Sequence, residues 1–317
     1  MSLPTVLENR LSIPVMASPM FIASGPELVI EQCKAGVVGS FPALNARPAS
    51  LLNDWLDRIE SELSGTDAAP FAVNQIVHRS NNRLEEDMAT IVEHQVPIVI
   101  TSLGARPEIN DAVHSYGGIV LHDIINNRFA HKAIEKGADG LIAVAAGAGG
   151  HAGTLSPFAL VQEIRQWFDG PLALSGSIAH GRSVLAAQAA GADLAYVGSA
   201  FLATEEANVV DGYKQMIVES SADDIVYSDL FTGVYGNYLR GSIEAAGLDP
   251  QNLPAGDPST MDFGSGGTTD AKAWKDIWGA GQGLGVVDAT VPTADLVARL
   301  VREYDEARRE LLAAVPA

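Results

Sequence analysis

Residues 135–154, EKGADGLIAVAAGAGGHAGT, contain the pattern that decides the fold. A glycine ends an expected helix at Gly137, an apolar run over 140–145 predicts a buried strand, and a loop with four glycines follows. The same helix-to-strand turn returns in AAGADLAYVGSAF, residues 189–201. This repetition is typical of consecutive βα units with parallel strands.

Outward from this stretch, the same alternation of short apolar runs and helical patterns covers about 200 residues. The eight expected strands are 13–16, 37–40, 71–74, 97–101, 119–122, 140–145, 172–174 and 194–197. The helices expected between them are 26–35, 48–63, 84–94, 108–116, 129–136, 157–168 and 182–190. A doubly wound sheet rarely has eight such units, so the predicted fold class is α/β, a (β/α)8 TIM barrel.

The rhythm of the barrel stops after Phe201. Residues 205–220 have a helical pattern, and 233–267 are rich in Gly, Pro, Asn and Tyr. We therefore expect a barrel at 1–205 and a smaller cap subdomain inserted after strand 8, at 206–289, over the barrel mouth. Residues 290–317 are expected to add a C-terminal helix, over 296–312, that packs back on the barrel.

The composition excludes several classes of partner. With 39 acidic and 20 basic residues, the 317-residue chain has a formal charge of −19, which argues against binding to nucleic acid or an anionic membrane. The lone Cys33 excludes an internal disulfide and a thiolate metal cluster. The seven histidines show no ligand spacing, so no metal site is expected. The N-terminus lacks a signal pattern and no apolar stretch reads as a membrane span, which predicts a cytoplasmic protein.

His151 is the candidate catalytic residue. It stands among glycines at the end of a predicted strand, where a histidine has few apolar neighbours to pack against. The chemistry of a barrel lies at this end of its strands. Gly147-x-Gly149-x-x-Ala152 also fits a loose dinucleotide fingerprint, but no helix begins inside it and it belongs to the sixth βα unit.

Two Gly–Ser pairs predict a phosphate site. Strand seven ends in SGSIAHG (175–181) and strand eight in VGSAF (197–201). Backbone N–H groups at such turns bind anions, and the loops after strands seven and eight are the usual phosphate pocket of a barrel. Either pair alone could be an ordinary turn with a capping serine. Their occurrence in consecutive units favours phosphate without naming the cofactor.

Taken together, the motifs resemble the nitronate monooxygenase (2-nitropropane dioxygenase) family of FMN-dependent barrels. The resemblance rests on PVMASPM (14–20), FAVNQ (71–75), AGAGGHAGT (146–154), LSGSIAHGR (174–182), AYVGSAFLATEEA (195–207) and WGAGQGLGVV (278–287). It implies bound FMN, with its phosphate at strands seven and eight and His151 facing the substrate beside the ring. The cofactor-binding residues implied are Ala17, Ser18, Pro19, Met20, Asn74, Gly149, Gly150, Ser175, Gly176, Ser177, Gly198 and Ser199.

The resemblance also implies a reaction, the oxidation of alkyl nitronates with O2 to a carbonyl compound and nitrite. His151 would be a base for a neutral nitroalkane or a charged partner for a nitronate. Asp123 stands where some relatives carry a lysine near the flavin, and Gly176-Ser177 stands where many have two glycines. Candidate substrate contacts in the cap are Tyr235, Tyr238 and Arg240, with cap packing as the ordinary alternative.

Other readings stay open. The same motifs occur in flavin reductases, so the alternative is an NAD(P)H-dependent flavin reductase or desaturase acting on a quinone or an enoyl (CoA) thioester. A barrel that binds flavin or phosphate without turnover would have no need of His151. The expected partner is a small-molecule substrate. The sequence leaves open the physiological substrate, the nicotinamide preference, the role of Asp123 and the oligomeric state, a homodimer included.

Overall fold

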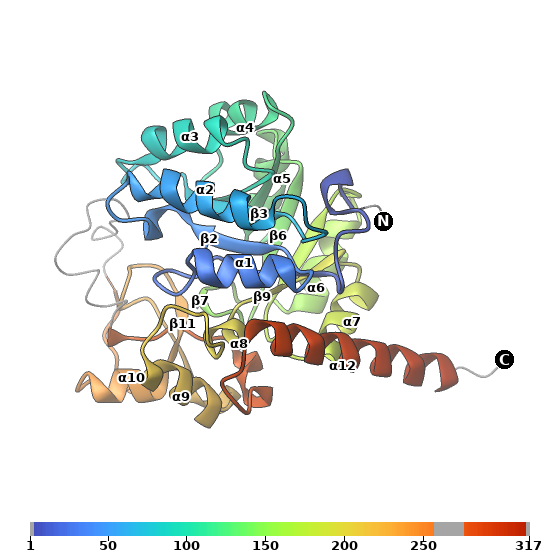
Figure 1. Ribbon diagram of the computed structural model, residues 1–317. Coiled ribbons are helices and arrows are strands. Elements are labelled where there is room, and N and C mark those ends of the chain that lie inside the picture. The colour runs from blue at the N-terminus through green and yellow to red at the C-terminus, as the bar shows by residue number, and fades with distance from the viewer. Residues whose placement is uncertain (1–2, 257–275, 315–317) are drawn as a thin grey trace.

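Eight parallel strands close into a barrel in the computed structural model, which describes residues 3–256 and 276–314 (Figure 1). The strands are β1 (Val15–Ala17), β2 (Gly39–Pro42), β3 (Phe71–Ile76), β4 (Ile98–Ser102), β5 (Ile119–Ile124), β6 (Gly140–Val144), β8 (Leu172–Ser175) and β9 (Leu194–Val197). Their order is β1-β9-β8-β6-β5-β4-β3-β2. A parallel bridge between Met16 and Val38 joins β1 to β2, so the predicted (β/α)8 barrel is confirmed.

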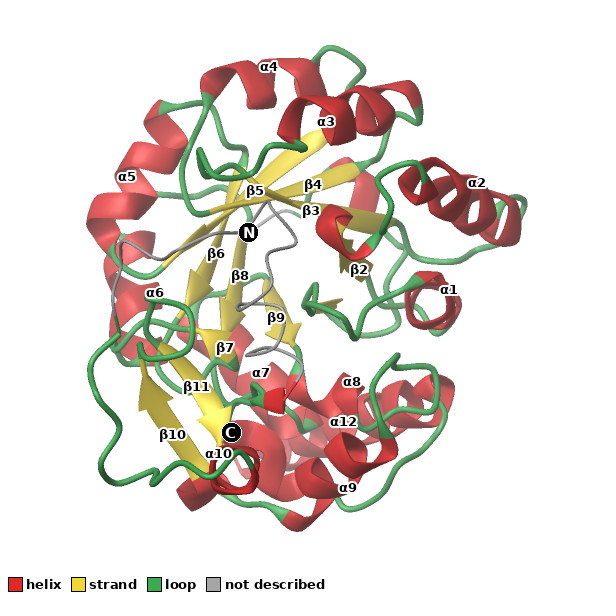
Figure 2. Cartoon of the chain, turned by 90° about the vertical axis from the view of Figure 1, so that its left-hand side faces the viewer, coloured by secondary structure: helices red, strands yellow, loops and turns green. Residues whose placement is uncertain are grey.

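Helices surround the strands, as Figure 2 shows. Successive strands are connected by α1 (Pro26–Lys34), α2 (Leu51–Leu63), α3 (Leu84–Glu93), α4 (Pro107–His114), α5 (Asn127–Glu135), α6 (Pro157–Arg165) and α7 (Gly181–Ala190), and the short α8 (Ser199–Leu202) follows β9. Single turns of 3-10 helix lie at η1 (Thr5–Leu7) and η2 (Ala43–Asn45). The outward strand residues and the apolar helix faces form one buried core.

The barrel interior is a second core, because side chains alternate between the two faces of each strand. It is filled by Met16, Val38, Ala72, Ile98, Ile100, Leu121, Ile142, Ala173, Leu194 and Tyr196, packed on Leu7 of η1. Two residues farther along β3, β4 and β5, this apolar filling gives way to Asn74, Ser102 and Asp123. The interior therefore ends in a polar layer at the C-terminal mouth, where barrel enzymes hold their chemistry.

The region after β9 forms a small cap. It contains α9 (Asp211–Glu219), η3 (Ala222–Asp224), β10 (Ile225–Ser228), β11 (Gly236–Leu239) and α10 (Arg240–Ala245). Helix was expected over 205–220, but α9 begins only at Asp211. Residues 257–275 of the predicted cap lie outside the described residues, and the boundaries 1–205, 206–289 and 290–317 stay a prediction.

The glycine-rich loop of the barrel is tied to this cap by a strand that the sequence did not predict. Gly150 and His151 form β7, which pairs with β11 in the antiparallel sheet β10-β11-β7 (Figure 2). His151 is aligned with Gly236, and Gly150 with Asn237. The pairing is close, since a Cβ on Gly236 would lie 2.8 Å from the carbonyl oxygen of Gly150.

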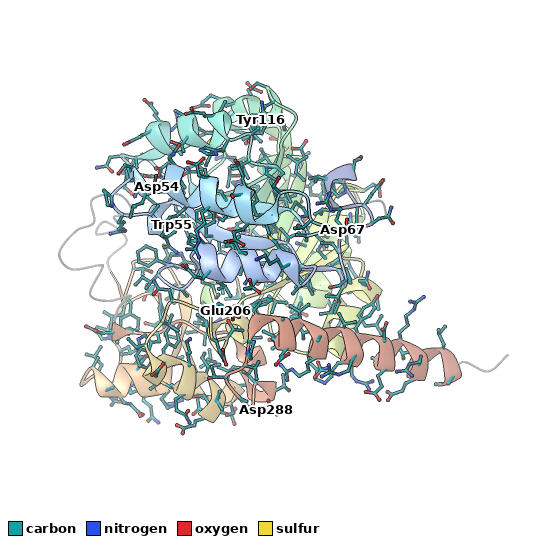
Figure 3. The ribbon with its side chains drawn as sticks, in the orientation of Figure 1. Asp54, Trp55, Asp67, Tyr116, Glu206 and Asp288 are labelled. Atoms are coloured by element: carbon teal, nitrogen blue, oxygen red, sulfur yellow. The ribbon has the colours of Figure 1, made fainter. Side chains whose placement is uncertain are left out.

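The chain then returns to the barrel. Residues of η5 (Gln282–Val286) lie against the loop after β8, and a Cβ on Gly283 would meet the backbone of Ser177 at 2.8 Å. The last helix, α12 (Thr293–Ala314), packs mainly on α7. Glu206 anchors its first turn by accepting from the amide and hydroxyl of Thr293 at 2.9 and 2.7 Å, and Figure 3 shows Glu206 beside that turn. None of the helices described is long and apolar enough to cross a membrane.

Candidate active site

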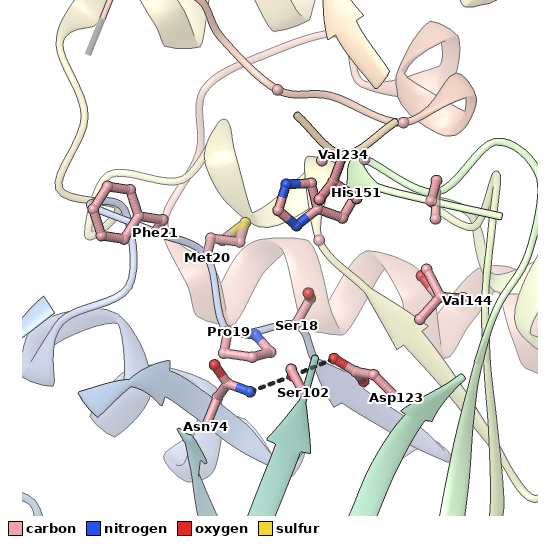
Figure 4. A pocket seen from close by; sticks show the side chains of 18 of the residues that line it. Ser18, Pro19, Met20, Phe21, Asn74, Ser102, Asp123, Val144, His151 and Val234 are labelled. Carbon is pink, nitrogen blue, oxygen red and sulfur yellow. Dashed lines mark hydrogen bonds between the residues drawn. The ribbon is translucent and has the colours of Figure 1, made fainter. Parts of the chain in front are cut away.

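A cavity of about 1090 Å³ opens at the C-terminal ends of the barrel strands (Figure 4). This volume lies at the upper end of the range for small-molecule sites. The structure brings together most of the residues predicted from the sequence, because the C-terminal ends of the barrel strands and the loops after them meet there. Those that line the cavity are Ser18, Pro19, Met20, Asn74, Gly149, Gly150, His151, Ser175, Gly176, Ser177, Gly198, Ser199 and Tyr235.

Three predicted residues do not line this cavity. Ala17 is fully buried within β1, where its carbonyl accepts from the hydroxyl of Ser40. Tyr238 packs into a separate cap cluster with Ile243. Arg240 donates to the carbonyl of Asp223. Neither Tyr238 nor Arg240 therefore lines the cavity: alternation along β11 directs the tyrosine into the cap, and the arginine begins α10 beyond that strand.

His151 projects into the cavity from the cap side (Figure 4). Its Nε2 lies 3.0 Å from the hydroxyl of Thr232, which in turn donates to the carbonyl of Val234 at 3.0 Å. Because that hydroxyl spends its single proton on Val234, it accepts from Nε2–H. This assigns the tautomer in which Nδ1 is the basic nitrogen of His151.

Burial decides the charge of this imidazole. Desolvation lowers the pKa of His151 to about 4, so the ring is neutral at neutral pH. A neutral imidazole accepts a proton but offers no positive charge to an anion. The geometry thus favours a base acting on an uncharged substrate over a charged partner for an anionic one.

The loops after β8 and β9 form a cradle of backbone groups. In the loop after β8, the N–H groups of Ile178 and Ala179 donate no hydrogen bond within the described residues. Gly176 (φ +139°) holds a conformation that favours glycine, and the neighbouring Ser177 is also left-handed (φ +58°). Helix α7 begins at Gly181, close to the predicted start at 182, so the cradle after β8 is a turn that precedes this helix.

Two further glycines shape this cradle. A Cβ on Gly149 would lie 2.8 Å from the amide nitrogen of Gly281, so the loop after β6 and the returning chain meet as bare backbone. The amide of Gly281 donates to the hydroxyl of Ser199 at 2.7 Å. The returning segment 278–287 is therefore part of the cavity wall, beside the loops after β8 and β9.

The strand ends opposite this cradle are polar and linked to one another. The amide of Asn74 donates to the hydroxyl of Ser102 at 2.7 Å, and that hydroxyl donates to Oδ2 of Asp123 at 2.6 Å (Figure 4). Burial raises the pKa of Asp123 to about 6, against the opposing effect of the hydrogen bond from Ser102. Beside it, His122 is buried with its Nδ1 2.6 Å from the hydroxyl of Thr101, and burial lowers its pKa to about 4.

Sequence reasoning missed Ser102 and the residues at the open edge of the cavity. Two of the latter are the exposed cations Arg47, whose guanidinium lies 5.4 Å from the centre of the Phe21 ring, and Lys132 on α5. Arg47 and Lys132 come from loops and helices after β2 and β5, and no local motif marks such positions. Stacked aromatic pairs add apolar wall: Tyr213 on Trp278 at 4.9 Å and Tyr227 on Tyr235 at 5.0 Å between ring centres.

One group of residues with the chemistry of metal ligands lies outside the cavity. Asp57, Glu60 and His94 bring one ligand atom each within 4.8 Å of one another on the outer helices, and none of them lines the cavity. The ring of His94 is already engaged by Glu60 and Asn53 at 3.2 and 3.1 Å. This cluster is an ordinary surface network of α2 and α3.

The sequence comparisons agree with this geometry. The family model described as nitronate monooxygenase matches residues 7–303. A nitronate monooxygenase of Paraburkholderia phytofirmans is 26% identical over 94% of each chain. A carboxyl-CoA dehydrogenase of Rhodococcus jostii, which acts on a hydroxy-methyl-oxo-octahydroindene, is 26% identical over 78% of this chain and 69% of its own length.

The structural comparisons agree on the fold. A nitroalkane oxidase from Streptomyces ansochromogenes superposes with a TM-score of 0.81 at 23% identity, over 96% of this chain and all of that one. FabK from Thermotoga maritima superposes with a TM-score of 0.79 at 22% identity, over 99% of this chain and all of that one. With a family match across nearly its whole length, this chain belongs to the nitronate monooxygenase family and is a flavin-dependent oxidoreductase.

Proposed function

We propose that this protein binds FMN and oxidises alkyl nitronates with O2, releasing a carbonyl compound and nitrite. The observation that carries the proposal is the neutral imidazole of His151, a base that can form the nitronate from a nitroalkane, held across a large cavity from a polar layer of strand ends. The name of the Paraburkholderia relative supports the reaction, and the family match supports a flavin. The cavity is also large enough for a cofactor and a small substrate together.

The residues present fit FMN. We assign its phosphate to the cradle of Gly176, Ser177, Gly198 and Ser199, where Ile178 and Ala179 have N–H groups to donate. A side chain at Gly149 would collide with Gly281, so only backbone borders the cavity here. That leaves room for a flat ring system. Ser18, Pro19, Met20 and Asn74 would line the ring from the strand ends, and Gly150 and Ser175 complete the wall. FMN supplies the redox chemistry when bound.

The chain's own contribution centres on His151. Nδ1 of the neutral ring is the assigned base, and it would take the acidic proton from a nitroalkane carbon to form the nitronate. The imidazolium then lies beside the anion that it has created, so each charge offsets the other. Thr232 holds the tautomer through Nε2. Residues of β11 exclude water from this side by pairing with β7.

A loading and turnover experiment tests this proposal. We expect purified protein to be yellow and to release FMN, not FAD, on denaturation. With propyl-2-nitronate it should consume O2 and form nitrite without any nicotinamide. Folded, colourless protein that takes up no added FMN would contradict the cofactor assignment, and flavin-loaded protein without O2 uptake would contradict the reaction.

The mouth of the cavity favours a second candidate, an NAD(P)H-dependent reductase or desaturase acting on a quinone or an enoyl (CoA) thioester. Arg47 and Lys132 are exposed cations at the cavity's open edge, in a chain of net charge −19. The exposed apolar side chains Ile22, Ile125 and Phe129 line the same cavity. Such an edge suits a long substrate with an apolar part and phosphate groups. The carboxyl-CoA dehydrogenase of Rhodococcus jostii is a relative of this kind.

Anaerobic mixing separates the two candidates. Rapid bleaching of the flavin absorbance by NADH or NADPH, with no O2 uptake on nitronate, would favour the second. An R47A/K132A double variant should then raise the KM for crotonyl-CoA by about 10-fold or more while leaving that for a short quinone unchanged. If the protein turns over nitronate without nicotinamide, and the R47A/K132A variant does so at the wild-type rate, the nitronate reaction is favoured.

A further inference from the structure

The buried carboxyl of Asp123 is an ionisable group that the proposed reaction does not use. It extends inward from β5 into the polar layer below the cavity, with Oδ2 held by Ser102. Its other oxygen, Oδ1, is buried and has no hydrogen-bond partner within the described residues. A buried carboxylate oxygen without a partner is costly, and a ligand group in the cavity would relieve that cost.

The barrel geometry puts this carboxyl on the side of the cavity that a ring would reach. In the ring of eight strands, β9 lies opposite β4, and β8 lies opposite β3. A phosphate held at β8 and β9 therefore directs the rest of an elongated cofactor across the mouth, toward Asn74, Ser102 and Asp123. Figure 4 shows these three side chains on one side of the cavity and His151 on the other.

We propose that Asp123 is the acid that makes the reduction potential of the bound flavin depend on pH, with Ser102 and Asn74 as its positioning residues. This inference rests on the proposed FMN site. As a protonated acid, Asp123 can donate a hydrogen bond from Oδ1 toward the ring. As a carboxylate, it places a negative charge beside the ring and disfavours the uptake of electrons. No covalent bond to the ring forms or breaks, because the carboxyl exchanges its proton with water.

The groups that face Asp123 each keep one charge state near neutral pH. From β9, Tyr196 faces it as a neutral phenol, since burial raises the pKa of that phenol well above its ordinary value. His122 on the same strand and His151 across the cavity are neutral, each with a pKa of about 4. Val144 on β6 and Ser102 on β4 do not titrate in this range. The pKa of Asp123, about 6, lies above the pKa values of the two histidines and below that of the Tyr196 phenol.

Other charged or titratable groups line the same cavity: Arg47, His78, Lys132 and Asp229. Lys132 is exposed at the edge, and Asp229 of the cap accepts from the amide of Gly256 at 3.0 Å. Asp229 provides the matched control, because its replacement removes the same charge from the same cavity without touching the polar layer.

The experiment measures the reduction potential of the FMN-loaded protein from pH 5 to 8.5, for the wild type, D123N, D229N and S102A. The wild-type curve should show a break near pH 6 that arises from Asp123. D123N should lose the break, with a potential more positive than wild type at pH 8 and equal to it at pH 5. D229N should keep the break. S102A should move it to higher pH, because the lost hydrogen bond stabilised the carboxylate.

The outcomes separate the two proposals. A wild-type curve without a break overturns the role of Asp123 even if no variant folds, and so does a D123N curve parallel to wild type at every pH. A constant offset would indicate a structural effect only. Protein that binds no FMN, checked first by the change in flavin fluorescence, overturns the cofactor assignment and this inference together.

Discussion

Burial sets the neutral state of His151 and Thr232 is a hydrogen-bond partner of its ring, and both effects can be tested at the residue. We expect H151A to bind FMN as wild type but to lose about 100-fold or more of its turnover with nitroalkanes, the usual contribution of a general base. The loss of turnover should be smaller with a preformed nitronate, because the carbon of that substrate has already lost its acidic proton. Stopped-flow flavin reduction with both substrates measures this. Equal losses on both would contradict the assignment of His151 as a base.

A substitution at Thr232, which lies within hydrogen-bond distance of His151, should cause a smaller loss of turnover. T232V removes the acceptor of Nε2–H while keeping the shape of the side chain. We expect about a 10-fold loss with nitroalkanes, because the ring can then adopt the wrong tautomer. FMN affinity should not change. Wild-type turnover in T232V would show that the tautomer is fixed by other contacts.

His122, a second histidine of the cavity, makes the free energy of unfolding depend on pH. Since the pKa of His122 falls from an unfolded value of about 6.5 to about 4 in the fold, the folded state binds fewer protons between these values. The free energy of unfolding therefore falls as pH drops through that window, by about 2 kcal/mol at pH 5 for this residue. Urea unfolding of H122N should be less sensitive to acid than that of wild type by this amount.

Asp123 acts in the opposite direction, because its raised pKa makes the folded state bind a proton more tightly below pH 6. The prediction for His122 therefore concerns the difference between the two proteins at pH 7.5 and at pH 5. An identical pH dependence in wild type and H122N would contradict it.

At the scale of elements, the strand that carries His151 depends on close backbone contact. In G236A the new methyl group would lie 2.8 Å from the carbonyl oxygen of Gly150, so β11 and β7 must separate. We expect a loss of about 1–3 kcal/mol in stability and a larger loss of turnover than of FMN affinity. G285A is the control, because its methyl group would meet its nearest neighbour at 3.8 Å. Turnover by G236A equal to that of G285A would show that the pairing does not matter for chemistry.

The same elements show what the sequence can and cannot predict. The barrel strands are short buried runs with a regular spacing, and all eight were found close to their predicted positions. The strand of Gly150 and His151 was predicted as loop, because it has two residues and exists only through pairing with β11, more than 80 positions away. The packing of Tyr238 in the cap could not be predicted for the same reason: without knowing that 236–239 is a strand, the face on which it lies could not be assigned.

At the scale of the molecule, the net charge of −19 is spread over a chain with few compensating cations. Self-repulsion of this kind destabilises the compact state and is screened by salt. We expect the Tm of the apoprotein to rise by about 2 °C or more between 10 and 200 mM NaCl at pH 8. Differential scanning fluorimetry with NaCl and KCl measures this. A Tm that falls with either salt would mean that favourable ion pairs outweigh the repulsion.

The edge shared by β7 and β11 has one more consequence. The imidazole lies on a two-residue ribbon whose hydrogen bonds come from the cap, so the cap cannot swing outward and leave the base behind. Any movement of the cap that separated β11 from β7 would therefore also displace His151 from its position at the cavity.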